Sequence, residues 1–126
     1  MIKARYSILV GGTSDDDVKK IVLEFDEGSS GQGVTTTDDH RIAAALREGR
    51  LTKTQVSDAL VEARGEVRNR DDLHALALFS RKLDAHKDDL VFWFAFVVLS
   101  SLDSKYTGAK NLLKHQLIRK LSEQEV

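Results

Sequence analysis

The sequence predicts an α+β protein that is mainly helical: an N-terminal β-hairpin followed by about five α-helices, with a central aromatic core helix. Three observations lead to this fold class. Apolar residues alternate with polar ones near the N-terminus, as in a strand. From residue 37 onward, apolar residues recur at the helical spacing. The segment 90–99, LVFWFAFVVL, is apolar on every side, which is typical of a buried helix.

We expect the hairpin within residues 1–27. Its first strand covers about 3–10, and GGTSDDD supplies the turn. In the second strand, VKKIVLEF, one face carries Ile21, Leu23 and Phe25. A helix over the same residues is an alternative, with Ser14 as its cap and Gly28 as its end. The β-branched residues of this segment and its lack of alanine favour the strand.

A glycine-rich connector, 28–36, joins the hairpin to a helical region, 37–126, and the whole of 1–126 is expected to form one domain. Polar residues that cap helices mark where each helix begins. The expected starts are Thr37, then Thr52 or Thr54, then Asn69 to Asp71, then Asp88 and Asp89, and finally about Thr107. Gly49 and Gly65 are expected to end the first two of these helices.

The connector contains GSSGQGVT, which resembles a phosphate-binding loop only in part. Gly28, Gly33 and Thr35 fit the pattern G-x-x-x-x-G-K-[ST], but Val34 stands where the lysine is needed. Several carboxylates flank the loop and would repel an anion. The sequence therefore predicts no nucleotide at this loop and no cofactor.

Charge and composition narrow the function classes. The 126 residues include 19 Lys and Arg against 20 Asp and Glu, and the net charge of -1 gives no overall attraction to nucleic acid. The absence of cysteine excludes disulfides and thiolate catalysis and fits a reducing cytoplasm. The N-terminal apolar run, Ile8 to Val10, is too short for a signal peptide, and 90–99 is too short to span a bilayer. We expect a cytoplasmic protein that does not enter membranes.

Asp38, Asp39 and His40 form the most catalytic-looking cluster, and a metal-dependent enzyme at this site is one hypothesis. Helix capping explains the same residues without any chemistry. The four histidines lack the spacing of a metal-binding pair on a helix, and no nucleophile motif is present. We therefore assign no catalytic, metal or cofactor residue and expect the protein not to be an enzyme.

A helix-turn-helix DNA-binding regulator is the second hypothesis. Residues 41–64 read as a short alanine-rich helix, a glycine turn and a second helix. Four residues near the start of the second helix would read bases, and three arginines would contact phosphates. These residues are Lys53, Thr54, Gln55 and Ser57, with Arg64, Arg68 and Arg70. A plain helical hairpin gives the same pattern.

The leading hypothesis is a small non-enzymatic protein-interaction module, of the inhibitor or regulatory kind, that binds a partner protein or a second copy of itself. The aromatic helix motivates it, because a chain of this size has difficulty covering every side of such a helix. The expected partner or self-association surface is formed by Phe92, Trp93, Phe94 and Phe96. Enclosure of this helix within the monomer is the alternative.

Overall fold

The computed structural model describes residues 15–27 and 35–124 and shows six helices and no strand within them. The fold is therefore all-α in these ranges, and the α+β prediction is wrong. The helices are α3 (Asp15–Glu27), α4 (Thr37–Glu48), α5 (Lys53–Arg64), α6 (Arg70–Ala85), α7 (Leu90–Ser100) and α8 (Ser104–Gln124). The predicted first strand at 3–10 and the loop residues 28–34 lie outside the described residues.

The predicted second strand is instead α3. Val18, Ile21 and Phe25 are buried, which is the spacing of one helical face. Leu23, which a strand would place beside Ile21 and Phe25, is 56% exposed. Packing of the buried stripe against α7 outweighs the strand preference of the β-branched residues, because secondary-structure propensity is weak relative to tertiary burial.

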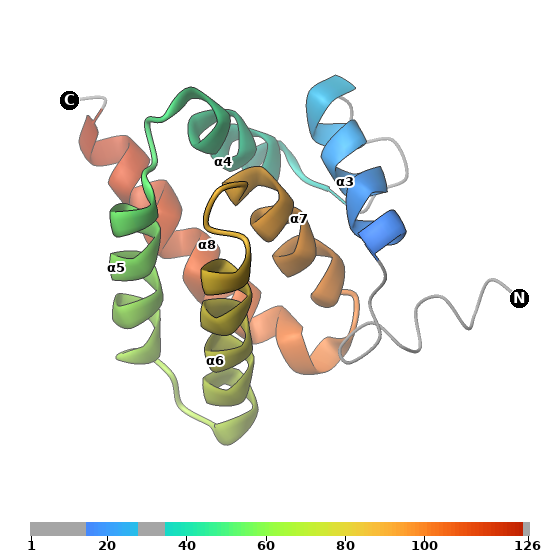
Figure 1. The fold of residues 1–126 in the computed structure, drawn as a ribbon. Coiled ribbons are helices and arrows are strands. Elements are labelled where there is room, and N and C mark those ends of the chain that lie inside the picture. Colours follow the sequence, from blue (N-terminus) through green and yellow to red (C-terminus); the bar gives the residue numbers. More distant parts are fainter. Residues whose placement is uncertain (1–14, 28–34, 125–126) are drawn as a thin grey trace, which may run out of the picture.

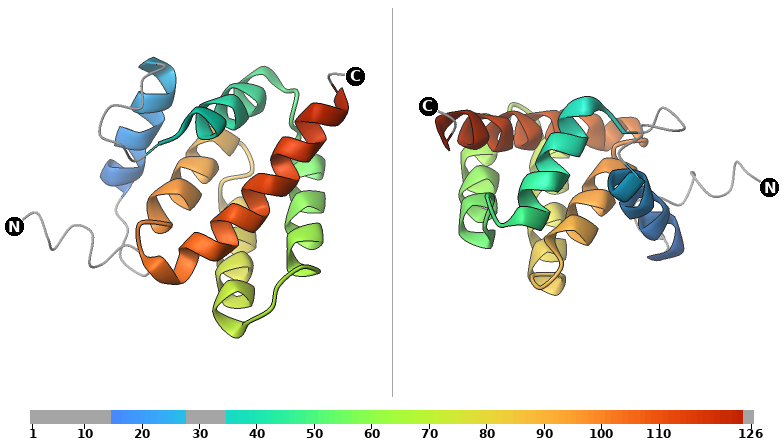
Figure 2. Two further views of the ribbon diagram at one scale, coloured as in Figure 1. Left: turned by 180° about the vertical axis from the view of Figure 1, so that it is seen from behind. Right: turned by 90° about the horizontal axis from the view of Figure 1, so that it is seen from above.

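The long helix α8 crosses behind α5 and α6, which run side by side in opposite directions (Figure 1). Seen from behind and from above, α8 also packs against α4 and α7 (Figure 2). Helix α3 lies at the edge of the molecule and packs mainly on α7. Among the helices of the described ranges, none covers the side of α5 and α6 that faces away from α8.

The aromatic helix α7 is part of the hydrophobic core, as the sequence predicted. All residues from Trp93 to Ser100 are buried. The Trp93 ring also donates a hydrogen bond of 2.8 Å from Nε1 to the backbone oxygen of Phe79, which ties α7 to α6. Phe25 of α3 stacks on Phe94 with 6.0 Å between ring centroids. Because α3, α4, α6 and α8 surround it, α7 has little surface left.

Side-chain caps define the helix starts, since the first backbone N–H groups of a helix have no partner within it. Thr36 and Thr52 each form a reciprocal capping box, with Asp39 and Gln55 respectively. Asn69 caps α6 by accepting a hydrogen bond of 2.8 Å from the Asp72 N–H. The predicted starts near 52 and 69 are confirmed, while the cap of α4 is one residue before the expected Thr37.

Gly49 ends α4 in the left-handed conformation, with φ of 80°. An added Cβ would meet no neighbouring atom, so the cost of a side chain here comes from the backbone alone. We expect Gly49→Ala to destabilise the protein by about 1 kcal/mol. Urea denaturation of the two proteins measures this difference. A stabilised variant would contradict the assigned backbone conformation. Gly65→Ala is the matched control, because Gly65 has a φ of -68°, which alanine adopts without strain.

No helix in the described ranges is both long enough and apolar enough to cross a membrane.

Candidate functional site

The most concentrated polar contacts lie where α8 meets the start of α4. Asp39 is completely buried, and its carboxylate is 3.3 Å from Lys110 Nζ and 3.2 Å from Lys114 Nζ. The Lys110 contact is a hydrogen bond, while the Lys114 contact to Oδ1 is an ion pair without hydrogen-bond geometry. Asp39 also accepts from the Thr36 N–H at 3.1 Å, and Lys114 donates to Thr36 Oγ1 at 2.9 Å. One carboxylate therefore joins a helix cap to two lysines.

Burial lowers the pKa of Lys110, with the Asp39 carboxylate opposing this shift and the Lys114 charge adding to it. A buried lysine with a lowered pKa can serve as a base or nucleophile in enzymes. Here the side chain of Lys110 is only 9% exposed and its ammonium donates to Asp39. These contacts give Lys110 a structural role in joining α8 to α4.

A second polar chain links α3 to α4. The Thr35 hydroxyl donates to Glu24 Oε1 at 3.1 Å and lies 3.0 Å from His40 Nε2. Since the hydroxyl has one proton and gives it to Glu24, His40 Nε2–H must be the donor of the second bond. A histidine that activates a hydroxyl nucleophile must instead accept its proton. This Glu, Thr and His arrangement is therefore a tether between helices and lacks the geometry of a catalytic triad.

The predicted metal cluster is not brought together. Asp38 pairs with Arg41 at 3.6 Å on the surface, Asp39 points to the two lysines, and His40 contacts Thr35. Across residues 15–27 and 35–124, no group of three His, Cys, Asp or Glu side chains is placed to share a metal ion.

Most of the residues that a DNA-binding helix would use to read bases have other partners. Lys53 lies 3.8 Å from Asp84, and the Gln55 side chain accepts from the Thr52 N–H at 2.9 Å. Ser57 faces α6, and Thr54 is exposed. Helix α4 packs on α7 and α8, whereas α5 packs on α6 and α8. The two helices therefore do not pack against each other as the helices of a helix-turn-helix motif do. Three arginines stay exposed at the other end of α5: Arg64, Arg68 and Arg70.

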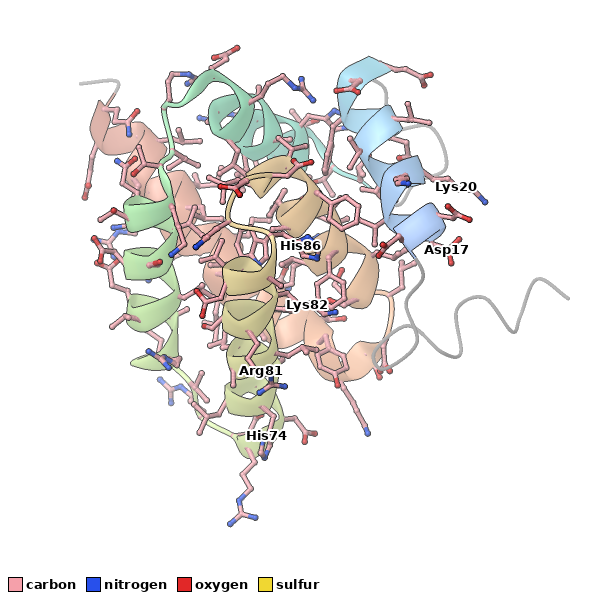
Figure 3. The ribbon with its side chains drawn as sticks, viewed as in Figure 1. Asp17, Lys20, His74, Arg81, Lys82 and His86 are labelled. Atoms are coloured by element: carbon pink, nitrogen blue, oxygen red, sulfur yellow. The ribbon has the colours of Figure 1, made fainter. Side chains whose placement is uncertain are left out.

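The predicted aromatic surface lies almost entirely inside the monomer. Trp93 and Phe94 are fully buried and Phe96 is 4% exposed. Phe92 is half-buried and contacts the ring of His86, with 4.8 Å between centroids. Lys82 lies over the Phe96 ring at 5.1 Å, and Figure 3 shows Lys82 of α6 and His86, which follows α6, on the side toward α7. Helix α6 thus covers one side of this aromatic cluster.

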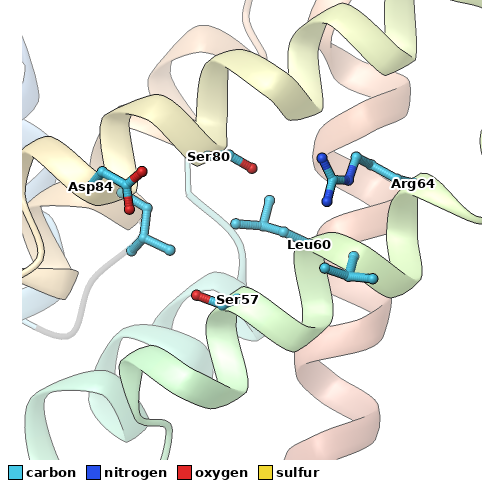
Figure 4. A pocket seen from close by; sticks show the side chains of 7 residues that line it. Ser57, Leu60, Arg64, Ser80 and Asp84 are labelled. Carbon is cyan, nitrogen blue, oxygen red and sulfur yellow. The ribbon is translucent and has the colours of Figure 1, made fainter.

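The groove between α5 and α6, with a volume of about 220 Å³, was not among the sites expected from the sequence. We name this surface the α5–α6 face. Its lining residues are Ser57, Leu60, Val61 and Arg64 from α5, and Ser80, Leu83 and Asp84 from α6. In Figure 4, Leu60 points between the helices, the Ser57 and Ser80 hydroxyls lie near it, and Arg64 and Asp84 lie at opposite ends. The groove thus has an apolar floor and one charge of each sign.

Exposed apolar side chains also gather on this surface. Of the four large apolar residues exposed in the described ranges, Val61 at 57% belongs to the α5–α6 face. Leu73, at 46%, lies on the same side of α6 as Ser80, because seven residues make two helical turns. Among residues 15–27 and 35–124, no carboxylate lies within ion-pair distance of Arg64. This surface therefore combines unburied apolar area with an unpaired cation.

Two other hollows lack this combination. One of about 520 Å³ is lined mainly by the turn after α5, residues 65–68, with Leu112. The other, about 210 Å³, lies beside the Asp39 cluster and is lined by Asp38, Asn111, Lys114, His115 and Ile118. Neither contains any of the four exposed large apolar residues. Of these three hollows in the described residues, the one on the α5–α6 face is therefore the strongest candidate for a binding site.

A signal for this face is present in the sequence. The buried stripe of α5 is Val56, Ala59, Leu60 and Ala63, and Val61 lies off that stripe. An apolar residue beside a complete core stripe is expected to be exposed. Comparison with protein-family models, curated proteins and solved structures finds no match to this chain.

Proposed function

We propose that the protein is a non-enzymatic protein-interaction module in the cytoplasm and that the α5–α6 face is its docking surface. The observation that carries this proposal is the position of Val61, which is 57% exposed in a groove between two helices. Grooves between antiparallel helices commonly bind an apolar helical face of a partner. Regulatory or inhibitory action through such binding remains part of the proposal.

The polar contacts support binding over catalysis. Three side chains are of types that often act in catalysis: Asp39, Lys110 and His40. In this structure they form hydrogen bonds that hold α3, α4 and α8 together. Arg64 and Val61, by contrast, have exposed groups that a partner can cover. Burying an apolar side chain and pairing a free arginine are typical sources of binding energy at protein interfaces.

Val61→Asp tests the proposal. We expect the purified, tagged protein to retain specific proteins, including an untagged copy of this chain, and the variant to lose them, because a carboxylate would be buried in the apolar contact. Affinity capture with quantitative mass spectrometry measures the retention. Leu23→Asp is the matched control, since Leu23 is 56% exposed but lies on α3.

Equal retention by the two variants would contradict a role for the α5–α6 face. The absence of any protein retained reproducibly by the wild type would contradict the interaction module itself. Circular dichroism of each variant establishes that a lost partner does not result from unfolding.

A further inference from the structure

We infer that the partner of the α5–α6 face is a second copy of this chain, bound about a two-fold axis. The inference rests on the proposed docking function and names its occupant. It follows from the diagonal placement of two opposite charges on the face, Arg64 at the end of α5 and Asp84 near the end of α6 (Figure 4).

The antiparallel pairing of α5 and α6 sets this diagonal. The ion pair of 3.8 Å between Lys53 and Asp84 shows that the start of α5 lies beside the end of α6. Arg64, at the other end of α5, therefore lies level with the early part of α6, near Leu73. Arg64 and Asp84 thus occupy opposite corners of the face.

A two-fold axis perpendicular to the face exchanges opposite corners. In such a dimer each contact occurs twice, because residue i of one copy meets residue j of the other and the reverse. Arg64 of each copy then lies over Asp84 of the other. Asp84 is available for this contact, since its side chain is 79% exposed and its distance to Lys53 is long. Arg64, which has no carboxylate within ion-pair distance in the described residues, thereby gains one.

The same operation matches the remaining residues. The two-fold axis lays α5 of one copy along α6 of the other, and both helices rise by the same distance per residue. Because residue 64 lies over residue 84, each α5 residue lies over the α6 residue about 20 positions later in the other copy. Ser57 then meets Ala77, and two small side chains permit close approach of the helices. Val61 meets Arg81, whose aliphatic stem can cover it, beside the small Ser80. Lys53 lies over Leu73, which its aliphatic stem can cover.

The size of the face predicts a weak dimer. Helices of 12 and 16 residues are about 18 and 24 Å long, and two of them side by side, each about 10 Å across, are about 20 Å wide. The face therefore offers about 400 Å² per copy, whereas a standard stable interface buries about 800 Å² per partner. Association should depend on concentration, with a Kd on the order of tens of micromolar or weaker.

A charge exchange tests the pairing. Arg64→Asp places two like-charged contacts in the dimer, and so does Asp84→Arg. Each variant alone should self-associate at least about 10-fold more weakly than the wild type. An equimolar mixture of the two variants should recover association to within about 3-fold of the wild type, because each copy then meets the opposite charge. Sedimentation velocity of the full chain, at up to about 1 mM, measures all three.

The control is Arg68→Asp, which reverses an exposed arginine outside the groove lining and should leave the association unchanged. Failure of the mixture to recover association would overturn the two-fold pairing, and so would a wild type that stays monomeric at about 1 mM. Another outcome is a monomeric wild type whose Val61→Asp variant, in affinity capture, loses a partner protein that is not this chain and that Leu23→Asp retains. In that case the self-association inference falls and the proposed function stands. If Val61→Asp and Leu23→Asp behave alike in both assays, both fall.

Discussion

Asp39→Asn is expected to destabilise the protein by about 3–5 kcal/mol. The substitution removes the only carboxylate that faces Lys110 and Lys114 within ion-pair distance in the described residues. It leaves a lysine with a 9% exposed side chain without a counter-charge, and loss of one member of a buried ion pair is costly for this reason. The substitution also weakens the cap of α4. Guanidinium denaturation followed by circular dichroism measures the change.

The neighbouring substitution Asp38→Asn is the control. Asp38 lies on the surface, and its pair with Arg41 at 3.6 Å is exposed, so its loss should cost no more than about 1 kcal/mol. Lys110→Met should also be tolerated much better than Asp39→Asn, because Asp39 keeps Lys114 and the costly burial of an ammonium is removed. Equal effects of Asp39→Asn and Asp38→Asn would contradict the buried cluster.

Trp93→Ala is expected to cost about 3–5 kcal/mol, because a fully buried large aromatic side chain leaves a cavity in the core. The loss also leaves the Phe79 carbonyl without the Nε1–H donor that joins α7 to α6. Urea denaturation followed by circular dichroism measures the destabilisation. Phe92→Ala should cost clearly less, since Phe92 is half-buried. A Trp93 variant within about 1 kcal/mol of the wild type would show that α7 is not the core helix.

The helical region was largely predictable from the sequence because its signals are local. The Thr52 and Asn69 side chains cap helix starts by accepting hydrogen bonds from backbone N–H groups three residues later. Gly49 ends α4 because glycine adopts a positive φ easily. The aromatic segment was expected in the core because it is apolar on every side. Such features depend little on the rest of the chain.

Helix α3 was misassigned because two local signals disagree and the core decides between them. Its β-branched residues favour a strand, while Val18, Ile21 and Phe25 have helical spacing. The partner for that stripe is α7, about 70 residues later in the chain. The ion cluster was missed for the same reason, since Asp39 and Lys110 meet only when α8 packs on α4.

The binding face also depends on tertiary packing. Arg64 and Asp84 are unremarkable as helix residues, and their diagonal arrangement exists only after α5 and α6 pair in opposite directions. Burial of the aromatic helix likewise followed from its four neighbouring helices. The expected interaction surface consequently shifts from the aromatic side chains to the α5–α6 face, where Val61 of α5 and Leu73 of α6 are exposed.

The most direct measurement is a dilution series of amide chemical shifts in ¹⁵N-labelled protein, from about 1 mM downward. The account predicts concentration-dependent shifts that cluster on the α5–α6 face, including Ser57, Val61 and Ser80, with α3 unchanged. Shifts that cluster on α3 and α7, or spectra that do not change with concentration, would contradict self-association through this face.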